Sequence, residues 1–184
     1  WYHRAEMIIT GKGEEQELRG ILFDYSGTVL ISGGFDLAAG LREVCSALTL
    51  PSGTNIEEVV SFAVETELEL QRIRDQTQLE FRFDSLLRLM IDYVGAKTAH
   101  SLKDLESVYY EAAVSYGPAP GVEAVLRSAI KAGIKTGIVS NSTNSGELLQ
   151  HQIEKNGLGD LFEFLISSAD YGIRKQHPLL FDVA

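Results

Sequence analysis

The sequence predicts an α/β protein whose parallel β-sheet is interrupted by an inserted helical module. Three observations predict this fold. A continuously apolar segment ends at Asp24, a long stretch of amphipathic helix patterns follows it, and strand and helix patterns alternate after residue 121. Strands that alternate with helices are typical of a parallel sheet. The 184 residues are enough for one sizeable core with a smaller inserted module.

Two strand patterns open the chain. Residues 6–10 ("EMIIT") and 16–24 ("QELRGILFD") flank "GKGEE", which favours a hairpin turn. Ile21, Leu22 and Phe23 form a continuously apolar run. Such a run predicts a central strand that is buried on both faces.

Four amphipathic helix patterns come next. Apolar residues recur at intervals of three or four within 37–48, 59–73, 86–94 and 105–116. No strand pattern separates them, so we expect a helical module over residues 34–117.

The second half of the chain alternates between strands and helices. The segment "GPAPG" at 117–121 favours a boundary, because prolines and glycines interrupt regular structure. The patterns that follow it predict a helix over 121–132 closed by Gly133, a strand over 134–140, a capped helix that ends on Gly157, a strand over 162–168, and a last helix that begins in "HPLLFDVA".

Charge and cysteine content narrow the choice of partners and compartment. The formal net charge of −10 disfavours nucleic acid and anionic membrane surfaces as partners. The single cysteine, Cys45, falls inside a helix pattern and is interpreted as a buried apolar residue. Because it excludes an internal disulfide, we expect a reducing, cytoplasmic location. No apolar run is long enough to span a membrane, and the four histidines lack zinc-ligand spacing.

Three polar residues follow the predicted strands of the parallel sheet. Asp24 ends the first strand, Ser140 ends the strand before the capped helix, and Lys175 comes just after the next strand. Ligands bind at the carboxyl ends of parallel strands, and helix N-terminal N–H groups can receive an anion. A carboxylate, a hydroxyl and a lysine at one edge suit phosphoryl transfer.

Three segments resemble the motifs of one known family. "FDYSGTVL", "GIVSNST" and "YGIRKQHPLLFDVA" are similar to motifs I, II and III of the haloacid dehalogenase-like superfamily, and the resemblance extends from residue 18 over almost the whole chain. It implies a discontinuous Rossmann-like core (1–33 and 118–184), with a C1-type helical cap (34–117) inserted between motifs I and II. It also implies that the C-terminal part of the core is missing from the sequence.

The resemblance implies a role for each motif residue. Asp24 would be the nucleophile that forms a covalent intermediate and a ligand of Mg²⁺, with the backbone carbonyl of Ser26 as a second ligand. Lys175 would offset the negative charge between Asp24 and a phosphate. Ser140, Asn141 through its N–H, and Thr28 would surround the phosphate, and Thr28 would also help fix the loop. The resemblance therefore implies a phosphatase that acts on a small phosphorylated metabolite.

The sequence departs from the family pattern in two places. Family phosphatases carry a second aspartate where Ser26 stands, and it acts as general acid and base. Serine does this poorly at neutral pH, so we expect slow hydrolysis or a long-lived intermediate. The acidic motif IV is also missing, since neither Asp170 nor Asp182 has its position. We therefore expect weak Mg²⁺ binding, because hard cations need several oxygen ligands.

Three other functions are consistent with the resemblance. A 2-haloacid dehalogenase forms an ester on the same aspartate without a metal, and Arg42, Arg72 or Arg74 could hold a substrate carboxylate. A phosphonoacetaldehyde hydrolase needs a cap lysine, for which only the late Lys97 and Lys103 are available. The domain could also be a non-catalytic binding module. The sequence makes no prediction of the oligomeric state.

Overall fold

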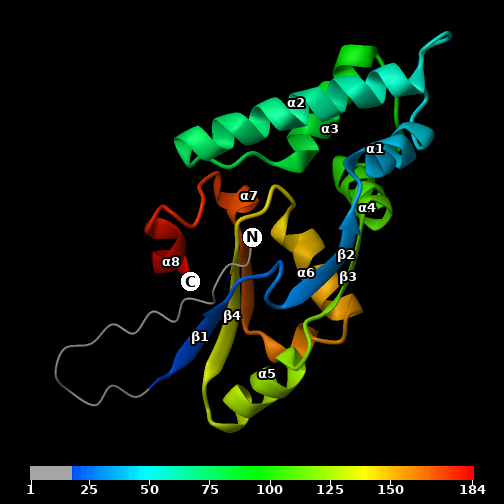
Figure 1. The fold of residues 1–184 in the computed structure, drawn as a ribbon. Coiled ribbons are helices and arrows are strands. Elements are labelled where there is room, and N and C mark those ends of the chain that lie inside the picture. Colours follow the sequence, from blue (N-terminus) through cyan, green and yellow to red (C-terminus); the bar gives the residue numbers. More distant parts are fainter. Residues whose placement is uncertain (1–17) are drawn as a thin grey trace.

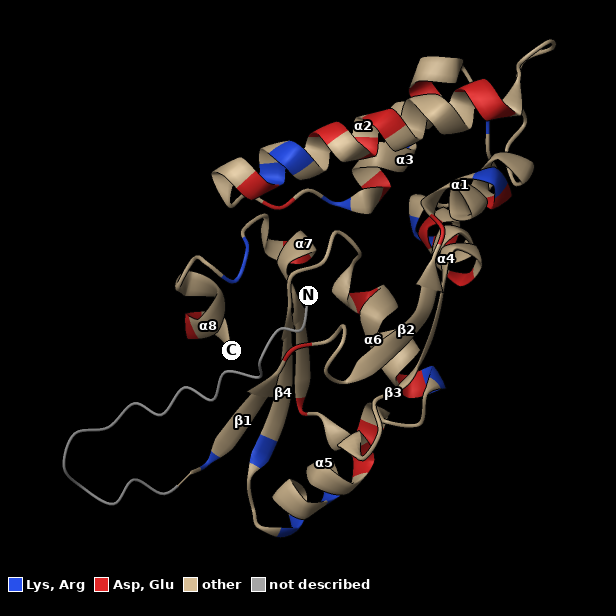
Figure 2. Cartoon of the chain, viewed as in Figure 1, with Lys and Arg blue, Asp and Glu red and all other residues tan. Residues whose placement is uncertain are grey.

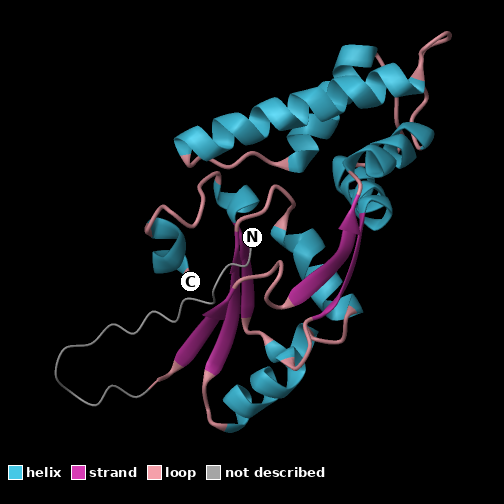
Figure 3. Cartoon of the chain, viewed as in Figure 1, coloured by secondary structure: helices cyan, strands magenta, loops and turns pink. Residues whose placement is uncertain are grey.

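The computed structural model describes residues 18–184 (Figure 1). The strand expected at 6–10 and the turn after it lie outside the described residues. The described part contains a parallel sheet flanked by helices, a helical segment that lies beyond one end of the sheet, and a two-stranded ribbon that joins them (Figure 3).

Within residues 18–184 the sheet has three parallel strands in the order β1-β4-β5. They are β1 (Gly20–Phe23), β4 (Lys135–Ser140) and β5 (Phe164–Ser167). Both strand pairs are parallel, so the three carboxyl ends meet at one edge of the sheet. The predicted parallel sheet is confirmed, and the residues that follow these strands are brought to a common edge.

Strand β1 is less buried than its sequence indicates. Among residues 18–184 it lies at the edge of the sheet, and Leu22 is 43% exposed. The interpretation of Ile21, Leu22 and Phe23 as a central strand buried on both faces is therefore wrong for the described part. A continuous apolar run does not report how many neighbours a strand has.

Helices flank the three strands. They are α5 (Val122–Lys131), α6 (Gly146–Lys155), the short 3₁₀ helix η1 (Gly159–Leu161), α7 (Ser168–Tyr171) and α8 (Leu179–Val183). The helices α5 and α6 were predicted, and the glycines expected to close them, Gly133 and Gly157, have left-handed φ angles of 76° and 74°. The short α7 and η1 were not predicted.

The four helices expected between the first two parallel strands are present. They are α1 (Leu37–Ser46), α2 (Ile56–Thr77), α3 (Phe83–Val94) and α4 (Leu102–Ala113). Leu41, Val44, Leu87 and Met90 are fully buried in this segment, and Cys45 is buried as expected. Apolar packing therefore holds the four helices together.

The fourth helix ends earlier than predicted. Tyr116, expected in that helix, lies in the strand β3 (Val114–Pro118), which pairs with the antiparallel strand β2 (Leu30–Phe35). These two strands were not predicted, and they link the sheet to the helices at both ends of the helical segment (Figures 1 and 3).

The longest helix carries many charges. Helix α2 has 22 residues, and acidic and basic side chains are distributed along it (Figure 2). In the described range 18–184, no helix is long and apolar enough to cross a membrane.

Candidate active site

The structure brings Asp24 and Lys175 into direct contact at the carboxyl edge of the sheet. The Lys175 ammonium donates to Asp24 Oδ1 over 2.7 Å, and the Tyr25 backbone N–H donates to the same oxygen over 2.8 Å. The side chains of Asp24 and Lys175 are 39% and 23% exposed. The ion pair is therefore formed within reach of solvent and of a small ligand.

The two carboxylate oxygens of Asp24 differ in their partners. Oδ1 accepts both hydrogen bonds, whereas Oδ2 accepts none from residues 18–184. A carboxylate fixed through one oxygen presents the other in a defined direction. This asymmetry suits a nucleophile, because the reacting oxygen keeps its lone pairs.

A tight turn follows Asp24. Gly27 has a φ angle of 77° and donates its N–H to the Leu30 carbonyl over 2.8 Å. Only glycine adopts this left-handed conformation without strain. The Tyr25 carbonyl accepts from Val29 and Leu30, whereas that of Ser26 accepts no hydrogen bond in the described part of the chain. The Ser26 carbonyl thus keeps its lone pairs for a ligand.

The loop is tied to the ribbon and to α4 by tyrosines. The Tyr25 hydroxyl lies 3.3 Å from that of Tyr110, and the Ser26 hydroxyl lies 3.1 Å from that of Tyr116. The rings of Tyr25 and Tyr116 meet edge to face with centroids 5.8 Å apart. Burial raises the pKa of Tyr25 and of Tyr110 well above their ordinary value, so both hydroxyls stay neutral.

Asn141 connects the loop after β4 with the loop that carries Lys175. Its Oδ1 accepts the Lys175 backbone N–H over 2.7 Å, and its Nδ2 donates to Gln176 over 3.4 Å. The side chain of Asn141 therefore positions the lysine. The phosphate contact expected from the backbone N–H of Asn141 stays a prediction.

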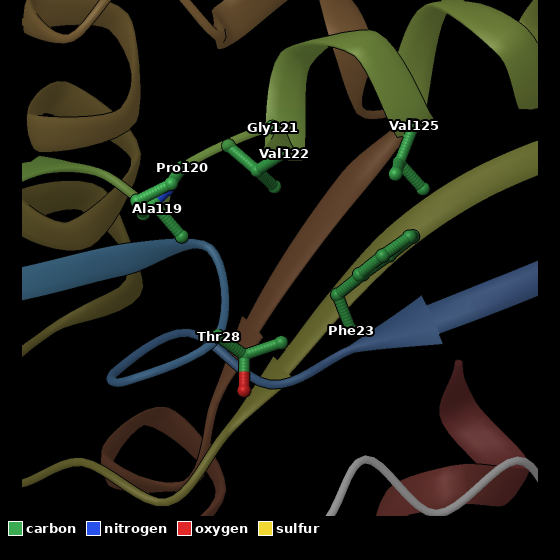
Figure 4. A pocket seen from close by; sticks show the side chains of 7 residues that line it. All are labelled: Phe23, Thr28, Ala119, Pro120, Gly121, Val122 and Val125. Carbon is green, nitrogen blue, oxygen red and sulfur yellow. The ribbon is translucent and has the colours of Figure 1, made fainter.

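The other two predicted phosphate residues lie in different surroundings. Ser140 is 3% exposed and ends β4 opposite Ser167. Thr28 is half-buried, and its side chain lines a surface depression of about 270 Å³ with residues that include Phe23 and Pro120 (Figure 4). Within residues 18–184 no side-chain hydrogen bond joins the Thr28 hydroxyl to Asp24. The contact expected between Thr28 and a phosphate stays a prediction.

The N-terminus of α6 is occupied by carboxylates of the chain itself. Glu106 accepts from the Ser145 N–H over 2.9 Å and from its hydroxyl over 2.7 Å, and Asp170 accepts from the Gly146 N–H over 2.9 Å. The helix dipole favours negative charge here. The expectation that this helix end receives a phosphate is therefore wrong for these N–H groups. Burial raises the pKa of Glu106, an effect that its bonds to Ser145 oppose.

The oxygen ligands near Asp24 do not form a metal site by themselves. Within residues 18–184 there is no group of three or more His, Cys, Asp or Glu residues that could hold a metal ion. Asp24 Oδ2 and the Ser26 carbonyl are two oxygens, and Mg²⁺ prefers six in near-octahedral geometry. Water and substrate oxygens would have to complete the shell of a metal ion bound there.

The candidate arginines for a substrate carboxylate already have carboxylate partners. Arg42 makes two bonds to Glu57, of 2.8 and 2.9 Å, and Arg72 pairs with Glu69 in the same helix. Arg74 lies 3.3 Å from a buried Glu80 oxygen. Each pair would have to open before its arginine could hold a substrate. The late lysine Lys103 likewise pairs with Glu147.

Fold and site together define a class of protein: an α/β enzyme fold with an aspartate–lysine pair at the carboxyl edge of a parallel sheet and helices inserted between its first two strands. The family model for haloacid dehalogenase-like hydrolases matches residues 18–184. The chain belongs to this family, and its Rossmann-like fold agrees with the expectation from the motifs.

Three comparisons describe its relatives. The pyrimidine 5′-nucleotidase YjjG of Escherichia coli K12 is 36% identical over 67 residues, which are 36% of this chain and 28% of that protein. A haloacid dehalogenase-like phosphatase from Thermococcus onnurineus shares the fold, with a TM-score of 0.58 and 17% identity over 91% of this chain and 70% of that one. The L-2-haloacid dehalogenase of Xanthobacter autotrophicus gives a TM-score of 0.48 and 21% identity over 91% and 63%.

Proposed function

We propose that the chain is a phosphatase that acts on small phosphorylated metabolites through a covalent intermediate on Asp24. The observation that carries this proposal is the asymmetric environment of the carboxylate. Oδ1 is held by Lys175 and by the Tyr25 N–H, whereas Oδ2 is without a partner in the described range.

The reaction would proceed in two displacements. Asp24 Oδ2 attacks phosphorus, the bond from phosphorus to the leaving oxygen breaks, and that oxygen takes a proton from water. Water then attacks the acyl phosphate, releasing inorganic phosphate and the free carboxylate. Splitting a difficult displacement into two easier ones is the advantage of covalent catalysis. Lys175 would offset charge that develops between Asp24 and the phosphoryl group.

The chain would be a slow phosphatase, because Ser26 is a poor acid and base at neutral pH. General acid–base catalysis contributes roughly a hundred- to ten-thousand-fold to a rate. The Ser26 hydroxyl lies 3.1 Å from that of Tyr116, so its side-chain partner is a phenol and not a carboxylate. The second displacement, which needs an activated water, would be slowed most.

The helical segment over 34–117 would act as the cap that selects the substrate. The loop between α2 and α3 contacts the chain next to Lys175. A substrate bound at Asp24 would therefore lie close to both the cap and the catalytic edge. The match to a pyrimidine 5′-nucleotidase makes pyrimidine nucleoside 5′-monophosphates a reasonable first class of substrate to test.

A substrate screen on the full chain tests the proposal. Phosphate release from an aryl phosphate and from pyrimidine nucleoside monophosphates is measured with and without Mg²⁺, alongside halide release from 2-chloropropionate. We expect phosphate release that added Mg²⁺ raises only weakly, because Asp24 Oδ2 and the Ser26 carbonyl supply two of the six oxygens that Mg²⁺ prefers. Asp24→Asn should abolish it with a nearly unchanged melting temperature, since a partly exposed ion pair contributes about 1 kcal/mol or less. Halide release without phosphate release would show a dehalogenase instead.

A further inference from the structure

The loop between α2 and α3 pairs with the segment that leads to Lys175. Leu79 and Ile173 form an antiparallel bridge. The Glu80 N–H donates to the Gly172 carbonyl over 2.9 Å, and the Arg174 N–H donates to the Gln78 carbonyl over 3.1 Å. The helical segment thus holds the main chain on the N-terminal side of Lys175.

The carboxylate of Glu80 is buried inside this contact. Its side chain is fully buried, with 0% exposure. One oxygen accepts from the Ser168 hydroxyl over 2.8 Å, and the other lies 3.3 Å from the Arg74 guanidinium. Burial raises the pKa of Glu80, an effect that Ser168, Arg74 and Arg174 oppose. Burying a carboxylate costs free energy unless the carboxylate is paired with a positive charge and hydrogen-bonded.

Ser168 passes the contact on to the loop after β4. Its hydroxyl, 0% exposed, accepts the Ser142 N–H over 2.9 Å while it donates to Glu80. Ser142 follows Asn141, whose side chain accepts the Lys175 N–H. The contacts therefore form a closed ring. It runs from Glu80 through Ser168 and Asn141 to Lys175, and it returns through the main-chain hydrogen bonds between residues 172–174 and 78–80.

We propose that Glu80 is a positioning residue that holds, through Ser168, the two loops that carry Asn141 and Lys175. The lysine is then aligned with Asp24 from outside the sheet, by the helical segment. A buried ion pair often adds little net stability compared with apolar side chains. We therefore infer that the pair of Glu80 with Arg74 acts mainly by fixing the geometry of the loops. The catalytic consequence rests on the proposed phosphatase function, whereas the geometric one does not.

Four variants of the full chain separate positioning from general stability. Glu80→Ala and Ser168→Ala each break the ring. Glu80→Gln preserves it, because the amide oxygen can accept from Arg74 while the amide nitrogen donates to Ser168, whose proton turns to the Ser142 carbonyl 3.1 Å away. Glu67→Gln is the matched control, since Glu67 is, like Glu80, a buried glutamate, but it lies in α2 and its hydrogen-bond partner, Gln71, lies in the same helix.

Two measurements are made on each variant. Amide hydrogen exchange without substrate reports on the N–H groups of Arg174 and Lys175. Steady-state kinetics with an aryl phosphate give kcat and KM. We expect exchange to accelerate about tenfold or more in Glu80→Ala and Ser168→Ala, and kcat to fall about tenfold with KM within about twofold, as for the loss of one charge-assisted hydrogen bond. Glu80→Gln and Glu67→Gln should stay within about threefold of the parent.

The outcomes are distinct. Unchanged exchange at Arg174 and Lys175 in Ser168→Ala would overturn the proposal, whatever happens to turnover. So would equal losses in Glu80→Gln and Glu80→Ala, because the first retains the hydrogen bonds. If Glu80→Ala does not fold, Ser168→Ala decides alone, since it removes only a hydroxyl. A parent without phosphatase activity would refute the proposed function, and the exchange measurement would still decide whether Glu80 positions the loops.

Discussion

The hydroxyl of Tyr116 lies 3.1 Å from that of Ser26. Tyr116 belongs to β3, so the second residue after the candidate nucleophile contacts the ribbon that joins the helices to the sheet. The position at which related phosphatases carry an acid therefore contacts the phenol of Tyr116, which can donate a hydrogen bond. A carboxylate placed there would gain a hydrogen bond from the phenol.

Ser26→Asp should accelerate turnover of an aryl phosphate. An aspartate two residues after Asp24 can protonate the leaving oxygen as the carboxylic acid and then activate the attacking water as the carboxylate. We expect a gain of about tenfold, a small part of the usual contribution. Stopped-flow and steady-state assays measure aryl phosphate turnover by Ser26→Asp, alone and combined with Tyr116→Phe. An unchanged rate, together with no accumulation of phosphoenzyme in the parent, would show that Ser26 does not limit the reaction.

Lys175→Met should lower kcat about a hundredfold, the scale for removing one group that stabilises developing charge. The methionine side chain is one atom shorter than that of lysine, and it lacks the ammonium that contacts Asp24. The matched control is Lys135→Met, which removes the exposed lysine paired with Glu163 at the start of β4. The control should leave kcat unchanged. If Lys175→Met retains more than a third of the parent rate, Lys175 has no role in charge stabilisation.

Glu106→Gln should change how stability depends on pH. Burial raises the pKa of Glu106 above its ordinary value of 4.5, so the folded state binds its proton more tightly than the unfolded state. The parent therefore loses free energy of unfolding as pH rises from about 4.5 to the folded pKa. The variant lacks this loss, and its stability relative to the parent should increase with pH over that range.

Glu111→Gln on the same helix is the control with the opposite sign. Lys155 and Gln152 lower the pKa of Glu111, so the parent gains stability from this group above 4.5 and loses it as pH falls through the folded pKa. Urea unfolding of all three proteins at a series of pH values tests both statements. If the free energy of unfolding of Glu106→Gln and of the parent depended on pH in the same way, the statement about Glu106 would be contradicted.

Gly40→Ala should destabilise the protein by about 1–3 kcal/mol, the usual cost of overpacking. A Cβ at Gly40 would lie 2.5 Å from the Tyr109 ring and 2.8 Å from Ala113, at the contact of α1 with α4. The clash outweighs the better helix propensity of alanine, about 1 kcal/mol. Thermal unfolding measures the change. A variant as stable as the parent would mean that α1 and α4 separate without cost.

Much of the architecture followed from local patterns. Apolar periodicity, glycines and capping residues predicted α1 to α6 and all three parallel strands, because each of these patterns lies within one short segment of the chain. The motifs also predicted which residues meet, since Asp24 and Lys175 follow strands whose ends share an edge. Both features depend on residue order along the chain more than on distant contacts.

The missed features depend on distant partners. Strand β2 has two adjacent glycines, and β3 continues the helix pattern of α4, so neither reads as a strand until they pair. The occupation of the α6 N-terminus by Glu106 joins residues 39 apart, and the contact of Glu80 with Ser168 joins residues 88 apart. No local pattern signals that either glutamate, one on a helix and one in a loop, will be buried.

The contact between Lys175 and Asp24 also has a kinetic consequence, because the two residues are 151 positions apart in the chain. Strands β1 and β4 can pair only after the whole helical segment has been looped out between them. Closing such a long loop costs entropy before any contact compensates for it, and long-range pairing slows folding. The helices α1 to α4, whose contacts are closer in sequence, can associate first. On refolding from denaturant, helical signal should therefore return before the aspartate–lysine pair is assembled, and activity should be the last property recovered.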